Sequence, residues 1–107
     1  MIARVWKGIV PLEKAEAYGS WLRDSEFGLS HYRATPGNLG AWLLRRVEGD
    51  RAHFLLLSTW ESLEAIRAYA GPDIAAARYF PFDRECLIEP DPLVIHYEVL
   101  ESGASSR

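Results

Sequence analysis

The segment that most constrains the fold runs from Ala52 to Gly71 and joins an apolar run to an amphipathic pattern. Phe54–Leu57 are four consecutive apolar residues, which is far too short a run to cross a membrane and is typical of a strand covered on both faces. After Trp60, apolar residues recur at helical spacing. Gly71 and Pro72 then end the helix, because glycine accepts a left-handed conformation and proline cannot continue the helix. The apolar positions of this predicted helix are Leu63, Ile66, Tyr69 and Ala70.

Composition and charge restrict the class of protein. The 107 residues are 49% hydrophobic and 25% charged, which indicates one globular domain. Twelve Lys and Arg against fifteen Asp and Glu give a net charge of −3, which argues against a nucleic-acid partner. Cys86 is the only cysteine and cannot form an internal disulfide, so we expect a reducing, cytoplasmic location and a small buried thiol. No signal peptide or membrane-length apolar stretch is recognisable, and we expect no membrane partner.

The remaining elements are predicted from periodicity and from turn residues. A Gly49-Asp50 hairpin turn would place Val47 opposite Ala52, with Leu43, Arg45, Leu56, Ser58 and Trp60 on one face and Trp42, Leu44, Arg46 and Leu55 on the other. Residues 25–38 are the least regular segment, which either borders a site or is a connector held by Phe27 and Tyr32. The other elements are a strand at 2–10, a helix from Pro11 to Asp24, a strand at 41–47, a short helix or turn at 73–79 ended by Pro81, and a strand at 93–100.

This order predicts an α+β, ferredoxin-like βαββαβ fold with a four-stranded antiparallel sheet. We expect residues 1–101 to form this single domain and residues 102–107 to be a disordered tail. Two helices cover only one face of such a sheet, yet the strands are apolar on both faces. An exposed second face would be a large apolar patch, so we expect a second copy to cover it in a two-fold homodimer.

Five stretches carry a resemblance to a known family. They are Tyr32–Asn38, Trp42–Arg46, Leu55–Ser62, Ala65–Gly71 and His96–Leu100. Together they resemble the antibiotic biosynthesis monooxygenase-like group of the dimeric α+β barrel superfamily, over residues 1 to about 101. The resemblance implies face-to-face dimerisation of the sheets and a site between sheet and helices. The superfamily also includes haem-degrading enzymes, isomerases, cyclases and members without known function.

The functional residues of that group match this chain at few positions. Of the residues that the cofactor-free monooxygenases use, the tryptophan is retained as Trp60, whereas Leu56, Ile66 and Phe80 stand where they have asparagine, tyrosine and arginine. In the haem-degrading branch, the positions of a tryptophan and a histidine fall near Tyr69 and Tyr79, and a tyrosine can ligate haem iron.

His96 is the candidate catalytic base. A neutral imidazole can accept a phenolic proton near physiological pH, and Glu98, two residues on along the strand, shares its face and could raise its pKa. The alternative is a structural histidine satisfied by a backbone or carboxylate partner at the dimer interface. The three histidines lack metal-ligand spacing, so no metal site is predicted.

Aromatic and arginine residues are the candidate substrate-binding groups. Arg4 and Arg45 alternate with apolar neighbours, and a buried arginine needs an anionic partner, either Glu98 or an acidic ligand. Aromatic side chains could wall a pocket or be ordinary core. These aromatic residues are Trp60, Tyr32, Tyr69 and Tyr79. Trp60 is assigned to catalysis together with His96, and the three tyrosines are assigned to substrate binding.

The sequence leads to one principal hypothesis and two alternatives. The first is a homodimer that binds a small aromatic or hydrophobic molecule and oxygenates it without a cofactor. The second is a non-catalytic small-molecule-binding or stress-related dimer, and the third is a haem-binding protein.

Overall fold

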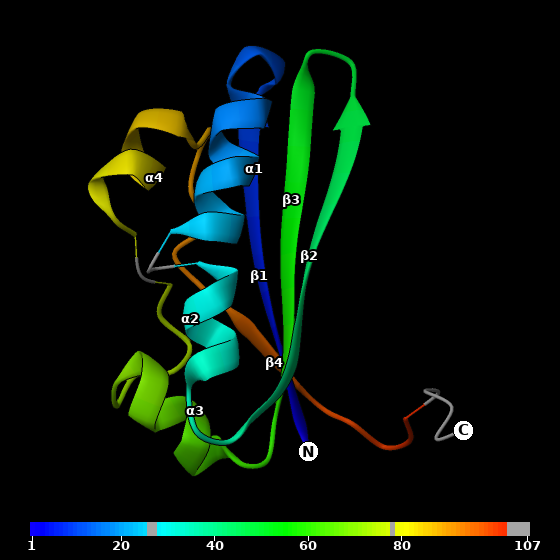
Figure 1. The fold of residues 1–107 in the computed structure, drawn as a ribbon, viewed down its shortest axis with the longest axis vertical. Coiled ribbons are helices and arrows are strands. Elements are labelled where there is room, and N and C mark those ends of the chain that lie inside the picture. The colour runs from blue at the N-terminus through cyan, green and yellow to red at the C-terminus, as the bar shows by residue number, and fades with distance from the viewer. Residues whose placement is uncertain (26–27, 78, 103–107) are drawn as a thin grey trace.

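The structure is a computed structural model that describes residues 1–25, 28–77 and 79–102. Four strands form one antiparallel sheet in the order β2-β3-β1-β4, and the helices lie together on one face of it (Figure 1). The predicted ferredoxin-like fold is thereby confirmed. The elements are β1 (Ile2–Pro11), a 3-10 turn η1 (Leu12–Lys14), α1 (Ala15–Asp24), α2 (Leu29–Ala34), β2 (Asn38–Glu48), β3 (Arg51–Trp60), α3 (Leu63–Ala70), α4 (Pro81–Cys86) and β4 (Ile95–Glu98).

The β2–β3 hairpin has the predicted register. Val47 pairs with Ala52 and Leu43 with Leu56, and Gly49 has a φ of 58°, which glycine adopts without steric cost. Because side chains alternate along a strand, this register also confirms the predicted division of residues between the two sheet faces. Phe54 and Leu56 are buried under the helices.

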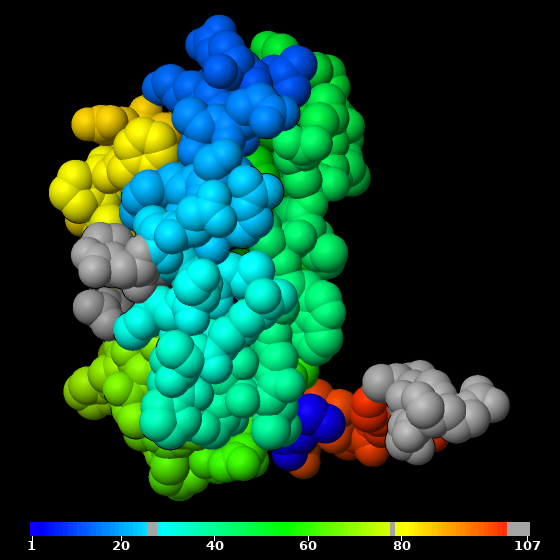
Figure 2. Space-filling view, viewed as in Figure 1, coloured from blue at the N-terminus to red at the C-terminus, as the bar shows by residue number. Residues whose placement is uncertain are grey.

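Helix α3 is also confirmed. The Ser62 side chain accepts a hydrogen bond from Ala65 N at 3.2 Å, which caps the first turn, and Gly71 with φ 89° follows the last residue. Ile66 is completely buried against the sheet. In the space-filling view, α1 and α2 form a continuous layer beside β2 (Figure 2). Within the described residues, no helix is both long and apolar enough to cross a bilayer.

Residues 73–79 were predicted as a short helix or turn, and the described part contains a turn at Ile74 and Ala75, where Ala76 N donates to Asp73 O at 3.3 Å. In the described part of this segment, Ala76 forms an isolated bridge with Leu93, and residue 78 lies outside the described residues. The helix α4 begins instead at Pro81, which we had expected to end a helix. Proline suits the first helical position, where its missing N–H costs nothing, and the Asp83 carboxylate accepts a hydrogen bond from Phe80 N at 2.7 Å.

Three other boundaries differ from expectation. The irregular segment at 25–38 contains α2, whose six residues are too few to show a clear period, although Leu29 and Tyr32 are buried one turn apart. Phe27 lies outside the described residues, as does the expected disordered tail apart from Ser102. Pro11 is the last residue of β1 rather than the start of a helix. The last strand, expected at 93–100, is limited to Ile95–Glu98.

The second face of the sheet is open in the single chain. Leu55 and Leu57, expected to be covered, are only half-buried. Large apolar side chains on the same face are exposed, among them Trp42 at 49%, Leu44 at 49% and Tyr97 at 56%. The helices therefore cover one apolar face, and the opposite apolar face remains uncovered.

Candidate functional site

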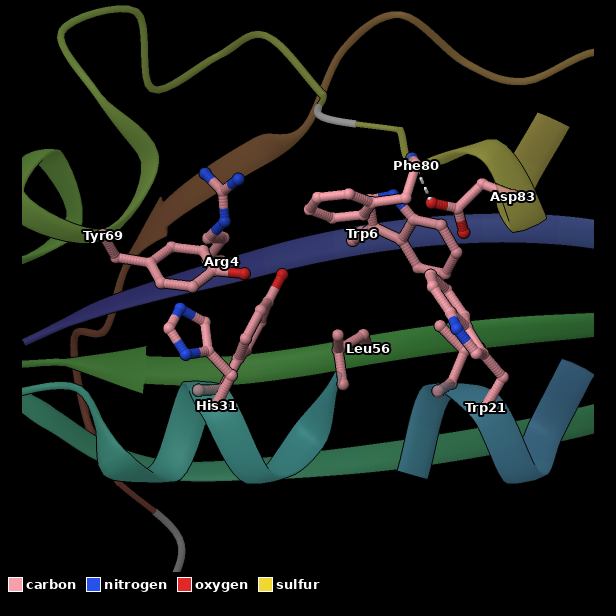
Figure 3. Close-up of a pocket in the computed structure, with 10 residues that line it drawn as sticks. Arg4, Trp6, Trp21, His31, Leu56, Tyr69, Phe80 and Asp83 are labelled. Carbon is pink, nitrogen blue, oxygen red and sulfur yellow. Dashed lines mark hydrogen bonds between the residues drawn. The ribbon is translucent and has the colours of Figure 1, made fainter. Parts of the chain in front are cut away.

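A cavity of about 320 Å³ lies between the sheet and the helical layer. Arg4, Tyr69 and His31 gather at one end, and Trp6, Trp21, Phe80 and Asp83 gather at the other, with Leu56 between them (Figure 3). The side chains come from β1, β3 and each of the helices α1 to α4. The full lining is Arg4, Trp6, Trp21, Leu22, His31, Tyr32, Leu56, Tyr69, Phe80 and Asp83.

Arg4 is the cation of this cavity. Its side chain starts from β1 under the helices and is only 2% exposed. Nη1 donates hydrogen bonds to Ile74 O at 2.8 Å and to His96 Nε2 at 2.9 Å, whereas Nε is buried without a partner. No described carboxylate forms an ion pair with the Arg4 guanidinium, so the alternative of a pair with Glu98 is wrong for the single chain. A buried cation without a counter-ion is costly.

His96 lies beside Arg4 on β4, outside the set of residues that line the cavity. A guanidinium can only donate, so His96 Nε2 must accept, and the ring is neutral with its proton on Nδ1. Burial, followed by the positive charge of Arg4, lowers the pKa of His96. The expectation that Glu98 would raise this pKa was therefore wrong.

The predicted aromatic residues form a packed group at the Arg4 end. The Tyr32 and Tyr69 rings make an edge contact with centroids 4.6 Å apart, and Arg4 Cζ lies 5.9 Å from the Tyr69 centroid. Trp60 is completely buried behind both tyrosines, and its Nε1 donates to Ser58 Oγ at 2.9 Å. Tyr32 and Tyr69 thus line the cavity, and Trp60 supports them from behind.

Tyr79 and Arg45 do not line the cavity either, in addition to His96 and Trp60. Tyr79 contacts Trp6, with centroids 6.5 Å apart, and its hydroxyl donates to Asp91 O; burial raises its pKa. Arg45 is exposed and pairs with Glu16 at 3.5 Å, so the structure does not bring it to Arg4.

Sequence reasoning selected three of the ten lining residues and missed the other seven: Trp6, Trp21, Leu22, His31, Leu56, Phe80 and Asp83. His31 is placed by the short α2, with its ring centroid 5.3 Å from that of Tyr69. Asp83 is only 3% exposed. It accepts hydrogen bonds from the Tyr18 hydroxyl at 2.6 Å and from Phe80 N, and burial raises its pKa. A proline two residues before an aspartate, the pattern of a helix start, was the one signal that could have found it.

Metal ligands do not gather in the described residues: no group of three or more His, Cys, Asp or Glu side chains is placed to hold a metal ion there. The cavity is instead an aromatic enclosure with a buried cation and a buried carboxylate. Such a site can bind a planar ligand between rings and fix its orientation through the charged groups.

Fold and cavity together define a ferredoxin-like α+β protein with a ligand-sized space between sheet and helices. Solved structures similar to the chain are antibiotic biosynthesis monooxygenase-like proteins, including MhuD, over nearly its full length, which confirms the resemblance stated from the sequence. No protein-family model and no curated protein matches the chain.

Three of these structures illustrate the likeness. A Nitrosomonas europaea protein assigned as an antibiotic biosynthesis monooxygenase is 17% identical, with 94% of this chain and 100% of that chain covered and a TM-score of 0.67. The haem degrader MhuD of Mycobacterium tuberculosis, with two haems bound in its active site, is 26% identical, with 97% and 100% covered and a TM-score of 0.60. An MhuD variant with two manganese protoporphyrin IX molecules per active site is 27% identical, with 98% and 100% covered and a TM-score of 0.65.

Proposed function

We propose that the cavity binds a small aromatic molecule that carries a negatively charged oxygen, with Arg4 as its counter-ion. The observation that carries this proposal is the state of Arg4. Its guanidinium is almost completely buried, lines the cavity, has an unpartnered Nε and pairs with no described carboxylate. A bound anion would compensate this charge, and the neutral His96 would hold the guanidinium in place as a hydrogen-bond acceptor.

The cavity volume limits the size of the ligand. A cavity of about 150 Å³ is enough for benzene, so about 320 Å³ accommodates roughly two aromatic rings. A haem, with four pyrrole rings and two propionates, is larger than this volume, which supports a ligand smaller than the haems bound to MhuD.

Cofactor-independent oxygenation is the reaction that we propose for such a ligand. An electron-rich phenol that loses its proton can react with O₂ at a ring carbon to give a quinone and water. The substrate itself supplies the electrons that reduce the second oxygen atom. Arg4 would stabilise the negative oxygen as charge develops on it. A proton acceptor other than His96 Nε2 is needed, because Arg4 already occupies that lone pair.

Calorimetric titration of the full chain with 2-naphthoate and the neutral 2-naphthamide tests the binding proposal. We expect the carboxylate to bind at least about tenfold more tightly, because a hydrogen bond to a charged group contributes about 1.5–3 kcal/mol. Equal affinities, or no binding of either compound, would contradict the proposal.

Oxygen uptake with 1-naphthol, with 1,4-naphthoquinone as product, tests the reaction. Binding without uptake across such phenols would favour the non-catalytic alternative, and a Soret band on addition of haem would favour the third.

We also propose that the protein is a homodimer whose open sheet faces pack together. Four exposed apolar side chains on one sheet face support this arrangement: Trp42, Leu44, Ile95 and Tyr97. Single exposed apolar residues are common on monomers, whereas several on one face are typical of an interaction surface. One two-fold axis would cover the face on both copies at once. Native mass spectrometry should find twice the chain mass, and a monomer at micromolar concentration would contradict the proposal.

A further inference from the structure

The cavity contains a second buried charge, at the end away from Arg4. Among the described residues, Arg4 and Asp83 are the charged side chains that are nearly fully buried, at 2% and 3% exposure, and both line this cavity. Figure 3 shows them at opposite ends, Arg4 beside Tyr69 and Asp83 beyond Phe80. The cavity therefore has a buried cation at one end and a buried carboxylate at the other.

Asp83 is held in a fixed orientation by two hydrogen bonds. Oδ1 accepts from the Tyr18 hydroxyl at 2.6 Å, and Oδ2 accepts from Phe80 N at 2.7 Å. Tyr18 is completely buried, and its pKa is raised by burial and by Asp83, so the hydroxyl stays protonated and donates. Because an ionised carboxylate can accept about four hydrogen bonds, Asp83 keeps acceptor capacity for a further donor.

Aromatic side chains surround Asp83 at this end of the cavity. The Trp21 and Phe80 rings meet edge to face with centroids 6.3 Å apart, and Trp6 lies beside them (Figure 3). A ligand ring that enters this end is therefore placed among apolar rings, where a polar substituent without a partner would be penalised. A hydroxyl directed at Asp83 would avoid that penalty.

We propose that the ligand of this site is a two-ring aromatic with polar groups at both ends, an anionic oxygen on Arg4 and a hydroxyl that donates to Asp83. This inference rests on the proposed function and specifies its substrate class as hydroxylated aromatic anions. Asp83 is a specificity-determining residue in this arrangement. It selects a hydrogen-bond donor, because a carboxylate that lacks its donor in a buried site loses a charge-assisted bond.

The test compares three ligands with the full-length protein: 2-naphthoate, 6-hydroxy-2-naphthoate and 6-methoxy-2-naphthoate. They share the carboxylate, and only the hydroxy compound can donate at the far end. We expect the hydroxy compound to bind about tenfold or more tightly than either of the other two. Because this comparison uses the unmodified chain, it does not depend on whether a variant folds.

Variants then locate the effect. Asp83→Asn keeps the volume of the side chain and removes its charge, and we expect the advantage of the hydroxy compound to fall to less than about threefold. The matched control is Glu85→Gln, an exposed position on the same helix, which should retain the full advantage. Circular dichroism verifies that both variants fold.

Failure of this inference can be told apart from failure of the proposed function. Equal binding of 2-naphthoate and the hydroxy compound would overturn the role of Asp83 and leave the Arg4 proposal standing. Loss of binding by the methoxy compound alone would show exclusion by size and would also overturn it. If none of the three carboxylates binds, the Arg4 proposal fails and the inference fails with it.

Discussion

The two faces of the sheet carry different kinds of side chain, although the same strands form both faces. On the helical face, Arg4 pairs in register with Ser58 and His96, and this polar group lies under the helices beside a cavity. On the opposite face, the large side chains of Trp42, Leu44 and Tyr97 are apolar and exposed. The open face is suited to contact with another protein surface, whereas the closed face keeps its buried charges next to a space for a ligand. The difference supports the two proposals made above, that a ligand binds at the closed face and that two copies assemble through the open one.

The largest expected effect of a substitution concerns the two tryptophans at the same end of the hairpin strands. Trp60→Ala should lower the free energy of unfolding by about 3–5 kcal/mol, because it leaves a cavity behind Tyr32 and Tyr69. Trp42→Ala removes an exposed ring and should cost much less at protein concentrations where the chain is monomeric. Urea denaturation measures both, and equal losses would break the distinction between the faces.

Assembly should depend on the open face alone. Leu44→Asp places a charge where two sheets are proposed to meet, and an uncompensated buried charge costs about 3–5 kcal/mol, so the dimer should dissociate at micromolar concentration. Leu12→Asp is the matched control, because Leu12 is similarly exposed, at 45%, but lies on η1. Analytical ultracentrifugation should find a monomer for the first variant and a dimer for the second. Two dimers would contradict the proposed interface.

Binding should depend on the closed face alone. Arg4→Met should weaken binding of 2-naphthoate by about 10- to 100-fold through loss of the charge-assisted hydrogen bonds. The free energy of unfolding should stay within about 1 kcal/mol of the original, because relief of a buried charge offsets the lost bonds to Ile74 and His96. Arg45→Met, at an exposed position, should change neither quantity. An Arg45 effect as large as that of Arg4 would argue against the site.

The smallest expected effect is a dependence of stability on pH. Since the pKa of His96 is lower in the folded chain than in the unfolded one, the unfolded chain takes up a proton first as the pH falls. Stability from this residue is therefore present above about pH 6.5 and is lost as the pH falls through the folded pKa. His96→Gln keeps an acceptor for Arg4 but cannot titrate. Its melting temperature should fall less between pH 7 and pH 5 than that of the original chain, and an equal fall would contradict the neutral state of His96.

Local signals in the sequence were sufficient for part of the fold. The Gly49-Asp50 turn predicts the observed hairpin register, and Gly71 marks the end of α3. Pro81 was misinterpreted because proline both ends helices and begins them, and the residues after it decide between the two roles. Helix α2 was missed because its six residues form fewer than two turns, which is too short for a helical period to be recognised in the sequence.

The site was less predictable because its contacts join distant parts of the chain. Arg4 and His96 are 92 positions apart, and Asp83 and Tyr18 are 65 apart. Pro81 before Asp83 marks a helix start, but no local pattern shows that Asp83 is buried, because acidic residues are favoured near helix N-termini at exposed positions as well. Arg4, Tyr32 and Tyr69 were selected as alternating or aromatic residues, and the fold brings these three to one cavity. Arg45 has the same local pattern but is exposed.

A crystal structure of the protein with 2-naphthoate tests the central claim most directly. We expect the rings between sheet and helices and the carboxylate within hydrogen-bond distance of Arg4, at the end lined by Tyr69 and His31. A naphthoate bound on the open sheet face, or bound in the cavity with its carboxylate away from Arg4, would contradict the proposed site.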